Sequence, residues 1–165
     1  MTQESYPLLR DAYAIIDGIP EDRFKLDSWR KARDPNNDNP SSCGTIGCAG
    51  GWLAMHPMMQ ERGLRSGRYG VPVIPAVDGM SLGPYRSLAA VLGISLWDSE
   101  QLFGTRACER SYDPVAYESK NLSDKEFWKA RVRNFLKVKD ELKEQDEKHF
   151  PRSTRCNVGT QCVGL

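Results

Sequence analysis

Apolar residues recur at helical spacing in four parts of the chain, and these parts are predicted to be helices. In residues 5–17, apolar side chains return every three or four positions until Gly18 and Pro20 end the pattern. The other three are residues 82–92, which Gly93 ends, residues 95–103, which Ser95 caps, and residues 123–148, which a capping box of Ser123 and Glu126 opens. Most of the predicted structure is therefore helical.

Extended structure is predicted at one place between the helices. The segment VPVIPAV, residues 71–77, has the composition of a strand, and Pro72 and Pro75 restrict it to a sheet edge. The segments left over are a short helix or turn over residues 21–32, a surface loop over residues 34–42 and a basic loop over residues 62–70. We therefore predict an α+β, mainly α-helical fold with one or two short edge strands. It forms a single compact domain over residues 1–150, followed by a polar, flexible tail over residues 151–165.

The long predicted helix carries an apolar stripe and a basic stripe. Its inward residues are expected to be Trp128, Val132, Phe135, Leu136 and Leu142. Cations recur every four residues at Lys125, Lys129, Arg133 and Lys137, and a second basic cluster consists of Arg62, Arg65 and Arg68. Because the helix turns acidic after its basic half, these cations suit a protein partner at least as well as a nucleic acid. We predict them as partner-binding surfaces.

The charge balance and the cysteine count narrow the function classes. With 23 basic and 22 acidic residues, the formal net charge is +1, which argues against a DNA mimic and against a protein that acts mainly by neutralising phosphates. No apolar run approaches the length needed to cross a bilayer, and the first residues do not form a secretory signal. Five cysteines, an odd number, favour reduced thiols. The expected location is the cytoplasm, with no membrane partner.

The segment CGTIGCAGGW, residues 43–52, is the most unusual in the chain. Thr45 is expected to cap a helix that runs to Met55 and stops before Pro57. Glycines inside a helix cost about 1 kcal/mol each relative to alanine, and Gly47, Gly50 and Gly51 would all lie inside this one. Such a helix needs a compensating contact. We expect another main chain to lie against it, too close for a β-carbon.

The same segment also permits metal or thiol chemistry. The chain has enough cysteines for a four-cysteine zinc site, namely Cys43, Cys48, Cys156 and Cys162. The spacings within the two pairs are wider than those of a zinc knuckle. Cys48, near a helix start, is a candidate thiolate, but His56 is too distant along the helix to act as its base. No phosphate-binding glycine motif and no catalytic set is present. An enzyme is therefore the minority interpretation, no cofactor is predicted, and zinc is the alternative.

CGTIGCAGGW resembles the pattern C-G-T-x-x-C-x-[AG]-G-W of small, mostly uncharacterised proteins from bacteriophages, prophages and bacteria. The matching positions are Cys43, Gly44, Thr45, Cys48, Gly51 and Trp52. Those proteins often carry R-F-x-[ML]-x-x-W upstream and A-x-x-L-G-[LI] followed by L-F downstream. The upstream match is Arg23, Phe24, Leu26 and Trp29, and the downstream match is Ala89, Leu92, Gly93, Ile94, Leu102 and Phe103. The resemblance implies a shared fold and a phage or bacterial cytoplasmic setting, but no mechanism.

These observations lead to one functional prediction and two alternatives. The chain is expected to be a non-enzymatic accessory protein of phage type that binds a host or defence-system macromolecule, most simply a protein. The alternatives are a zinc-binding or thiol-dependent protein that uses Cys43 and Cys48, and a weak nucleic-acid-binding module.

Overall fold

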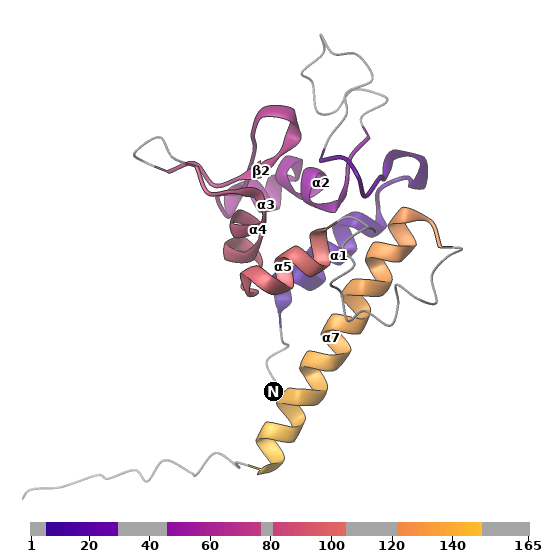
Figure 1. Cartoon of the computed structure of the whole chain (residues 1–165), viewed down its shortest axis with the longest axis vertical. Coiled ribbons are helices and arrows are strands. Elements are labelled where there is room, and N and C mark those ends of the chain that lie inside the picture. The colour runs from indigo at the N-terminus through magenta and orange to yellow at the C-terminus, as the bar shows by residue number, and fades with distance from the viewer. Residues whose placement is uncertain (1–5, 30–45, 77–80, 105–121, 150–165) are drawn as a thin grey trace, which may run out of the picture.

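The computed structural model describes residues 6–29, 46–76, 81–104 and 122–149 of the chain, which are coloured in Figure 1. The elements in these ranges are α1 (Pro7–Asp17), η1 (Glu21–Arg23), α2 (Ala49–Met55), α3 (Pro57–Glu61), β1 (Arg65–Ser66), η2 (Arg68–Gly70), β2 (Pro72–Val73), α4 (Pro84–Leu92), α5 (Leu96–Phe103) and α7 (Asp124–His149). The fold is α+β and mainly α-helical, as the sequence predicts. The predicted loop over residues 34–42 and the predicted tail lie outside the described residues.

Local signals determine where several helices begin and end. Ser95 Oγ accepts a hydrogen bond from the Asp98 amide at 3.0 Å at the start of α5, and Ser123 Oγ accepts one from the Glu126 amide at 3.3 Å at the start of α7. α4 ends at Gly93, which adopts the left-handed conformation with φ 67°. These predicted caps are confirmed.

The extended segment is shorter than predicted. β2 has two residues and pairs antiparallel with β1, so that Arg65 lies opposite Val73 and Ser66 opposite Pro72. Pro72 has no amide hydrogen, and Ile74, the first residue after β2, donates its amide hydrogen to Ser87 Oγ at 2.9 Å instead of to a neighbouring strand. The predicted basic loop therefore contains one strand of this small hairpin.

The core lies where α1, α2, α4, α5 and the first half of α7 meet (Figure 1). Its largest fully buried side chains are Trp128, Phe24 and Phe127. Trp128 lies at the centre, with ring centroids 6.4 Å from Tyr13, 6.5 Å from Phe24 and 5.9 Å from Phe103. The second half of α7 extends beyond this body.

The glycine-rich helix begins later than predicted. α2 starts at Ala49, and its N-cap is Cys48 in an extended conformation, so the prediction that Thr45 caps it is wrong. Gly47 lies before the helix because its main chain pairs with Phe24 in a parallel bridge, and its amide donates to the Arg23 carbonyl at 3.0 Å. Long-range main-chain pairing therefore overrides the local capping signal.

Main chain lies against α2 at Gly51, as predicted. A β-carbon on Gly51 would stand 1.5 Å from the Trp29 carbonyl oxygen, which is a covalent distance. At Gly50, a β-carbon would meet the Trp29 ring at 2.8 Å and the Leu88 side chain at 3.1 Å. The Cys48 amide donates to the Ser28 carbonyl at 2.6 Å and completes this contact. Packing against the chain at Trp29 therefore explains Gly50 and Gly51.

Candidate functional site

The cations predicted on α7 are largely engaged within the protein. Lys125 Nζ donates to the main-chain carbonyls of Asp17 and Ile19, each at 2.7 Å, where α1 ends. Lys129 Nζ lies 2.7 Å from the Asp17 carboxylate and 2.8 Å from that of Glu126. The hydrogen bond to Asp17 is the main reason that the pKa of Lys129 is raised, and the same contact lowers the pKa of Asp17. These two lysines fasten α1 to α7.

The next two cations of the stripe are more exposed. Arg133 Nη1 donates to the Tyr13 hydroxyl at 2.7 Å, which is a third link between α7 and α1. Lys137 is 74% exposed, and its Nζ lies 4.0 Å from the Glu141 carboxylate. The four predicted cations therefore do not form one open basic surface, since three of them contact α1.

The second basic cluster lies at the hairpin, away from the projecting half of α7 (Figure 1). Arg62, Arg65 and Arg68 are all exposed. Arg65 Nη1 donates to the carbonyl of Leu64 at 3.0 Å, and the Arg68 guanidinium lies 4.8 Å from the ring centroid of Tyr69. Of the three cations, Arg68 lies beside an exposed aromatic ring, and the cluster is not brought together with the cations of α7.

Cys48 is a buried thiol. The residue is 3% exposed and borders a cavity of about 70 Å³ beside Trp29 and Tyr85. Burial raises the pKa of Cys48 to about 11, and the amides of Gly51 and Gly50 oppose this shift less strongly. Trp52, the last residue of the segment, is half-buried, and its indole nitrogen donates to the Arg23 carbonyl at 3.2 Å. This environment keeps the thiol neutral near pH 7 and disfavours nucleophilic chemistry.

The other predicted metal ligands, Cys43, Cys156 and Cys162, lie outside the described residues, as do Gly44 and Thr45. Within the described ranges, no group of three or more His, Cys, Asp or Glu side chains is placed to hold a metal ion. No helix in these ranges combines the length and the apolar composition needed to cross a bilayer.

The burial of Cys48 predicts a pH dependence of stability. The ordinary pKa is 9.0 and the folded pKa is about 11, so the folded state binds the thiol proton more tightly than the unfolded state. This contribution is fully present below pH 9 and is lost as the pH rises from 9 to 11, to a total of about 2–3 kcal/mol. We expect urea unfolding between pH 8 and pH 10.5 to show this loss in the wild type. Cys48→Ala should show a shallower decline, and parallel curves for the two proteins would contradict the assignment.

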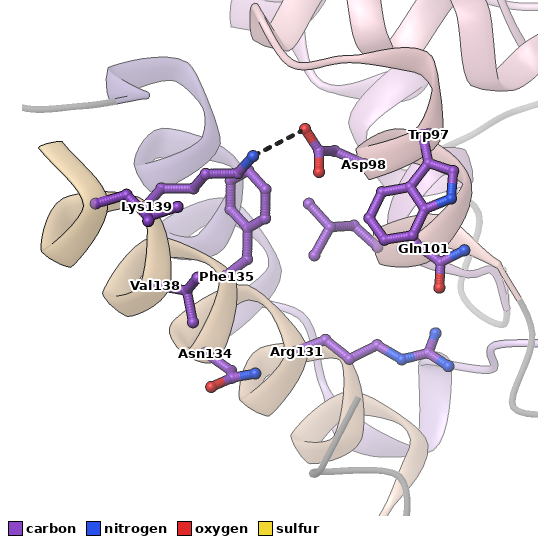
Figure 2. A pocket seen from close by; sticks show the side chains of 10 residues that line it. Trp97, Asp98, Gln101, Arg131, Asn134, Phe135, Val138 and Lys139 are labelled. Carbon is purple, nitrogen blue, oxygen red and sulfur yellow. Dashed lines mark ion pairs between the residues drawn. The ribbon is translucent and has the colours of Figure 1, made fainter. Parts of the chain in front are cut away.

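A groove that combines apolar and polar side chains lies between α5 and α7. It has a volume of about 250 Å³, and its lining includes Trp97, Gln101, Asn134, Phe135, Val138 and Leu142. Figure 2 shows the α5 side chains facing those of α7 across it. The two helices run antiparallel, because Arg131 Nη1 donates to the Gly104 carbonyl at 2.8 Å near one end and Lys139 lies 3.6 Å from Asp98 near the other.

Large apolar side chains are exposed at this groove. Trp97 is 57% exposed, Val138 44% and Leu142 50%. Exposed apolar side chains are ordinary when scattered singly, but three of the seven found among the described residues line this one groove. The prediction that Leu142 faces inward is wrong, because α7 continues past the body that covers Trp128, Val132 and Leu136. The apolar stripe of α7 is therefore longer than the surface available to cover it.

Half of the ten residues that line the groove are polar or charged, and three of these have partners within the protein. Lys139 and Asp98 form an ion pair across it, and Arg131 is buried beneath it with its guanidinium 4.3 Å from the Phe127 ring centroid. The Gln101 carbonyl oxygen Oε1 is buried and accepts no hydrogen bond from the described residues. A polar acceptor therefore lies beside the apolar surface.

The size of the groove indicates the kind of ligand that it suits. Small-molecule sites usually have volumes of about 300–1,000 Å³ and enclose most of the ligand. This groove is smaller and open, and no nucleophile and base converge in it. It therefore suits side chains presented by a macromolecule better than an enclosed substrate.

Comparison of the chain with protein-family models, with curated proteins and with solved structures found no match. The resemblance to phage-type proteins therefore stays a prediction. In the structure, two of the segments on which it rests lie side by side, since residues 23–29 contact residues 47–52 at the Gly47 bridge and at Gly51.

The groove was not predicted from the sequence, although α5 and α7 were. In the sequence, Trp97 and Leu142 are apolar residues within two predicted amphipathic helices. Only the packing of these helices shows that both side chains remain exposed at one groove. The available signal was the length of the apolar stripe, which continues at seven-residue spacing from Trp128 through Phe135 to Leu142.

Proposed function

We propose that this chain is a non-enzymatic accessory protein of phage type, which binds a host or defence-system protein in a bacterial cytoplasm through the α5–α7 groove. The single observation that carries the binding role is the exposure of Trp97, Val138 and Leu142 around one open groove. Tryptophan is enriched among residues that dominate binding energy at protein interfaces. The phage and bacterial setting comes from the sequence resemblance alone.

Two further observations favour a binding protein over the alternatives. The burial and raised pKa of Cys48 disfavour a reactive thiol. Lys125, Lys129 and Arg133 contact α1, so the α7 stripe offers few cations to a nucleic-acid backbone. A groove that combines exposed apolar side chains with polar ones is typical of protein interfaces.

The proposal predicts that Trp97→Ala removes binding of the partner. Truncating a central aromatic anchor costs about 2 kcal/mol or more, roughly a 30-fold loss of affinity. We expect the immobilised wild-type protein to retain one or more proteins from a bacterial lysate, and the variant to retain at least tenfold less of them. Quantitative mass spectrometry of the eluates measures this ratio.

Leu96→Ala is the matched control, because Leu96 is an exposed apolar neighbour on the same helix and does not line the groove. It should retain the same proteins as the wild type. Equal retention by Trp97→Ala and the wild type would exclude the groove as the binding surface.

A further inference from the structure

A second cavity, of about 240 Å³, lies between α1 and α7 and is lined by Arg10, Tyr13, Arg133 and Leu136. It shares none of these residues with the α5–α7 groove. Two guanidinium groups and a phenol hydroxyl, all hydrogen-bond donors, therefore meet beside one apolar side chain. The proposed function makes no use of this arrangement.

The donors of this cavity are positioned by the fold. The Tyr13 ring stacks at 6.4 Å on Trp128, which is fully buried, so the core fixes the direction of the phenol. Its hydroxyl accepts a hydrogen bond from Arg133 Nη1 at 2.7 Å, and Arg10 Nη2 lies 2.8 Å from Asp140. Both arginines are partly exposed and come from different helices. A ligand can therefore reach them without displacing the core.

Two carboxylates near the cavity are engaged by Lys129. Glu126 lies 2.8 Å from Lys129 and only 4.0 Å from Arg133, so its closest partner is the lysine. Asp17 is also held by Lys129. The two carboxylates closest to Arg133 on this face are therefore directed mainly at Lys129.

We propose that this cavity binds a phosphate monoester group. Guanidinium groups bind phosphate through paired, charge-assisted hydrogen bonds, and a dianion with three terminal oxygens can engage two arginines and a hydroxyl at once. A ligand that offers only one carboxylate would gain little binding energy, because Asp140 already supplies a carboxylate to Arg10. Exposed ion pairs contribute little to stability, so a phosphate group can replace Asp140 at small cost. The Leu136 side chain, which also lines the cavity, offers apolar contact to a group attached to the phosphate.

Titration with inorganic phosphate and with phenyl phosphate tests this site at constant ionic strength. Two-dimensional NMR of the arginine side-chain Nε–H groups and of the backbone amides reports which residues respond. We expect saturable shifts confined to Arg10, Arg133 and the residues around Tyr13, with phenyl phosphate binding several-fold more tightly than inorganic phosphate.

Three variants separate a built site from general electrostatic attraction. Arg133→Gln should weaken phenyl phosphate binding at least tenfold, and Tyr13→Phe, which removes only the hydroxyl, should weaken it about threefold. Lys137→Gln removes one charge from the same helix outside the cavity and should leave the affinity unchanged. An equal loss in Lys137→Gln, or shifts that do not saturate, would overturn the proposal. If inorganic phosphate and phenyl phosphate bind with equal affinity, the proposed contact between Leu136 and an apolar group of the ligand is wrong.

Discussion

Gly51→Ala should destabilise the protein by about 3 kcal/mol or more, the largest effect that we expect from adding a single methyl group. The new β-carbon would stand 1.5 Å from the Trp29 carbonyl oxygen and 2.6 Å from its carbonyl carbon. These are main-chain atoms, so no change of side-chain rotamer relieves the clash. Either α2 or the chain that ends at Trp29 must move, and the Cys48–Ser28 hydrogen bond lies between them. Urea unfolding measured by circular dichroism gives the free energy of unfolding.

Two other glycines provide graded controls for this prediction. At Gly50 the contacts are with side chains of Trp29 and Leu88, which can shift, so Gly50→Ala should cost less, about 1–3 kcal/mol. At Gly18 the closest contact is 3.4 Å and the backbone is right-handed, so Gly18→Ala should be neutral or stabilising by up to about 1 kcal/mol. Unfolding of Gly51→Ala at the same urea concentration as Gly18→Ala would contradict the packing assignment.

Trp128→Ala should cost about 3–5 kcal/mol, because it removes a fully buried indole that contacts aromatic rings from three other parts of the chain. Trp128→Phe should cost less than half of that. The indole Nε1 is buried and has no hydrogen-bond partner among the described residues, so phenylalanine removes an unsatisfied donor whose burial is itself unfavourable by about 1–3 kcal/mol. The difference in unfolding free energy between the two variants is the informative quantity.

Trp97 offers a matched control for this second prediction. It is the same residue type on a neighbouring helix, but it is more than half exposed. Trp97→Phe should change the free energy of unfolding by less than about 0.5 kcal/mol. A Trp128→Phe variant as unstable as Trp128→Ala would show that the shape of the indole, rather than its apolar area, stabilises the core.

The buried and the exposed tryptophan together illustrate how α7 serves two purposes. Its first half completes the core through Trp128 and Val132 and is fastened to α1 by Lys125 and Lys129. Its second half carries the same apolar stripe past the body, and there Val138 and Leu142 remain exposed and line one groove with Trp97. With 26 residues, the helix is about 39 Å long. The part of it that the fold does not cover is the part that we assign to the partner.

The cationic residues of α7 show what sequence periodicity alone leaves undecided about a predicted surface. A repeat of four residues places Lys125, Lys129 and Arg133 on one helix face, and the sequence predicts that face correctly. Whether such a face binds a partner or another helix of the same chain depends on what packs against it. Here α1 presents its last carbonyls, Asp17 and the Tyr13 hydroxyl to these three cations.

The sequence by itself determined the helices, most of their caps and the need for glycine near Cys48, because these depend on residues close together in the chain. Only the tertiary structure decided that α2 starts at Ala49 instead of being capped by Thr45, since a parallel bridge to Phe24 takes Gly47 out of the helix. It also decided that three of the α7 cations contact α1 and that Leu142 stays exposed. Each of these depends on contacts between segments far apart in the chain, which local periodicity does not specify.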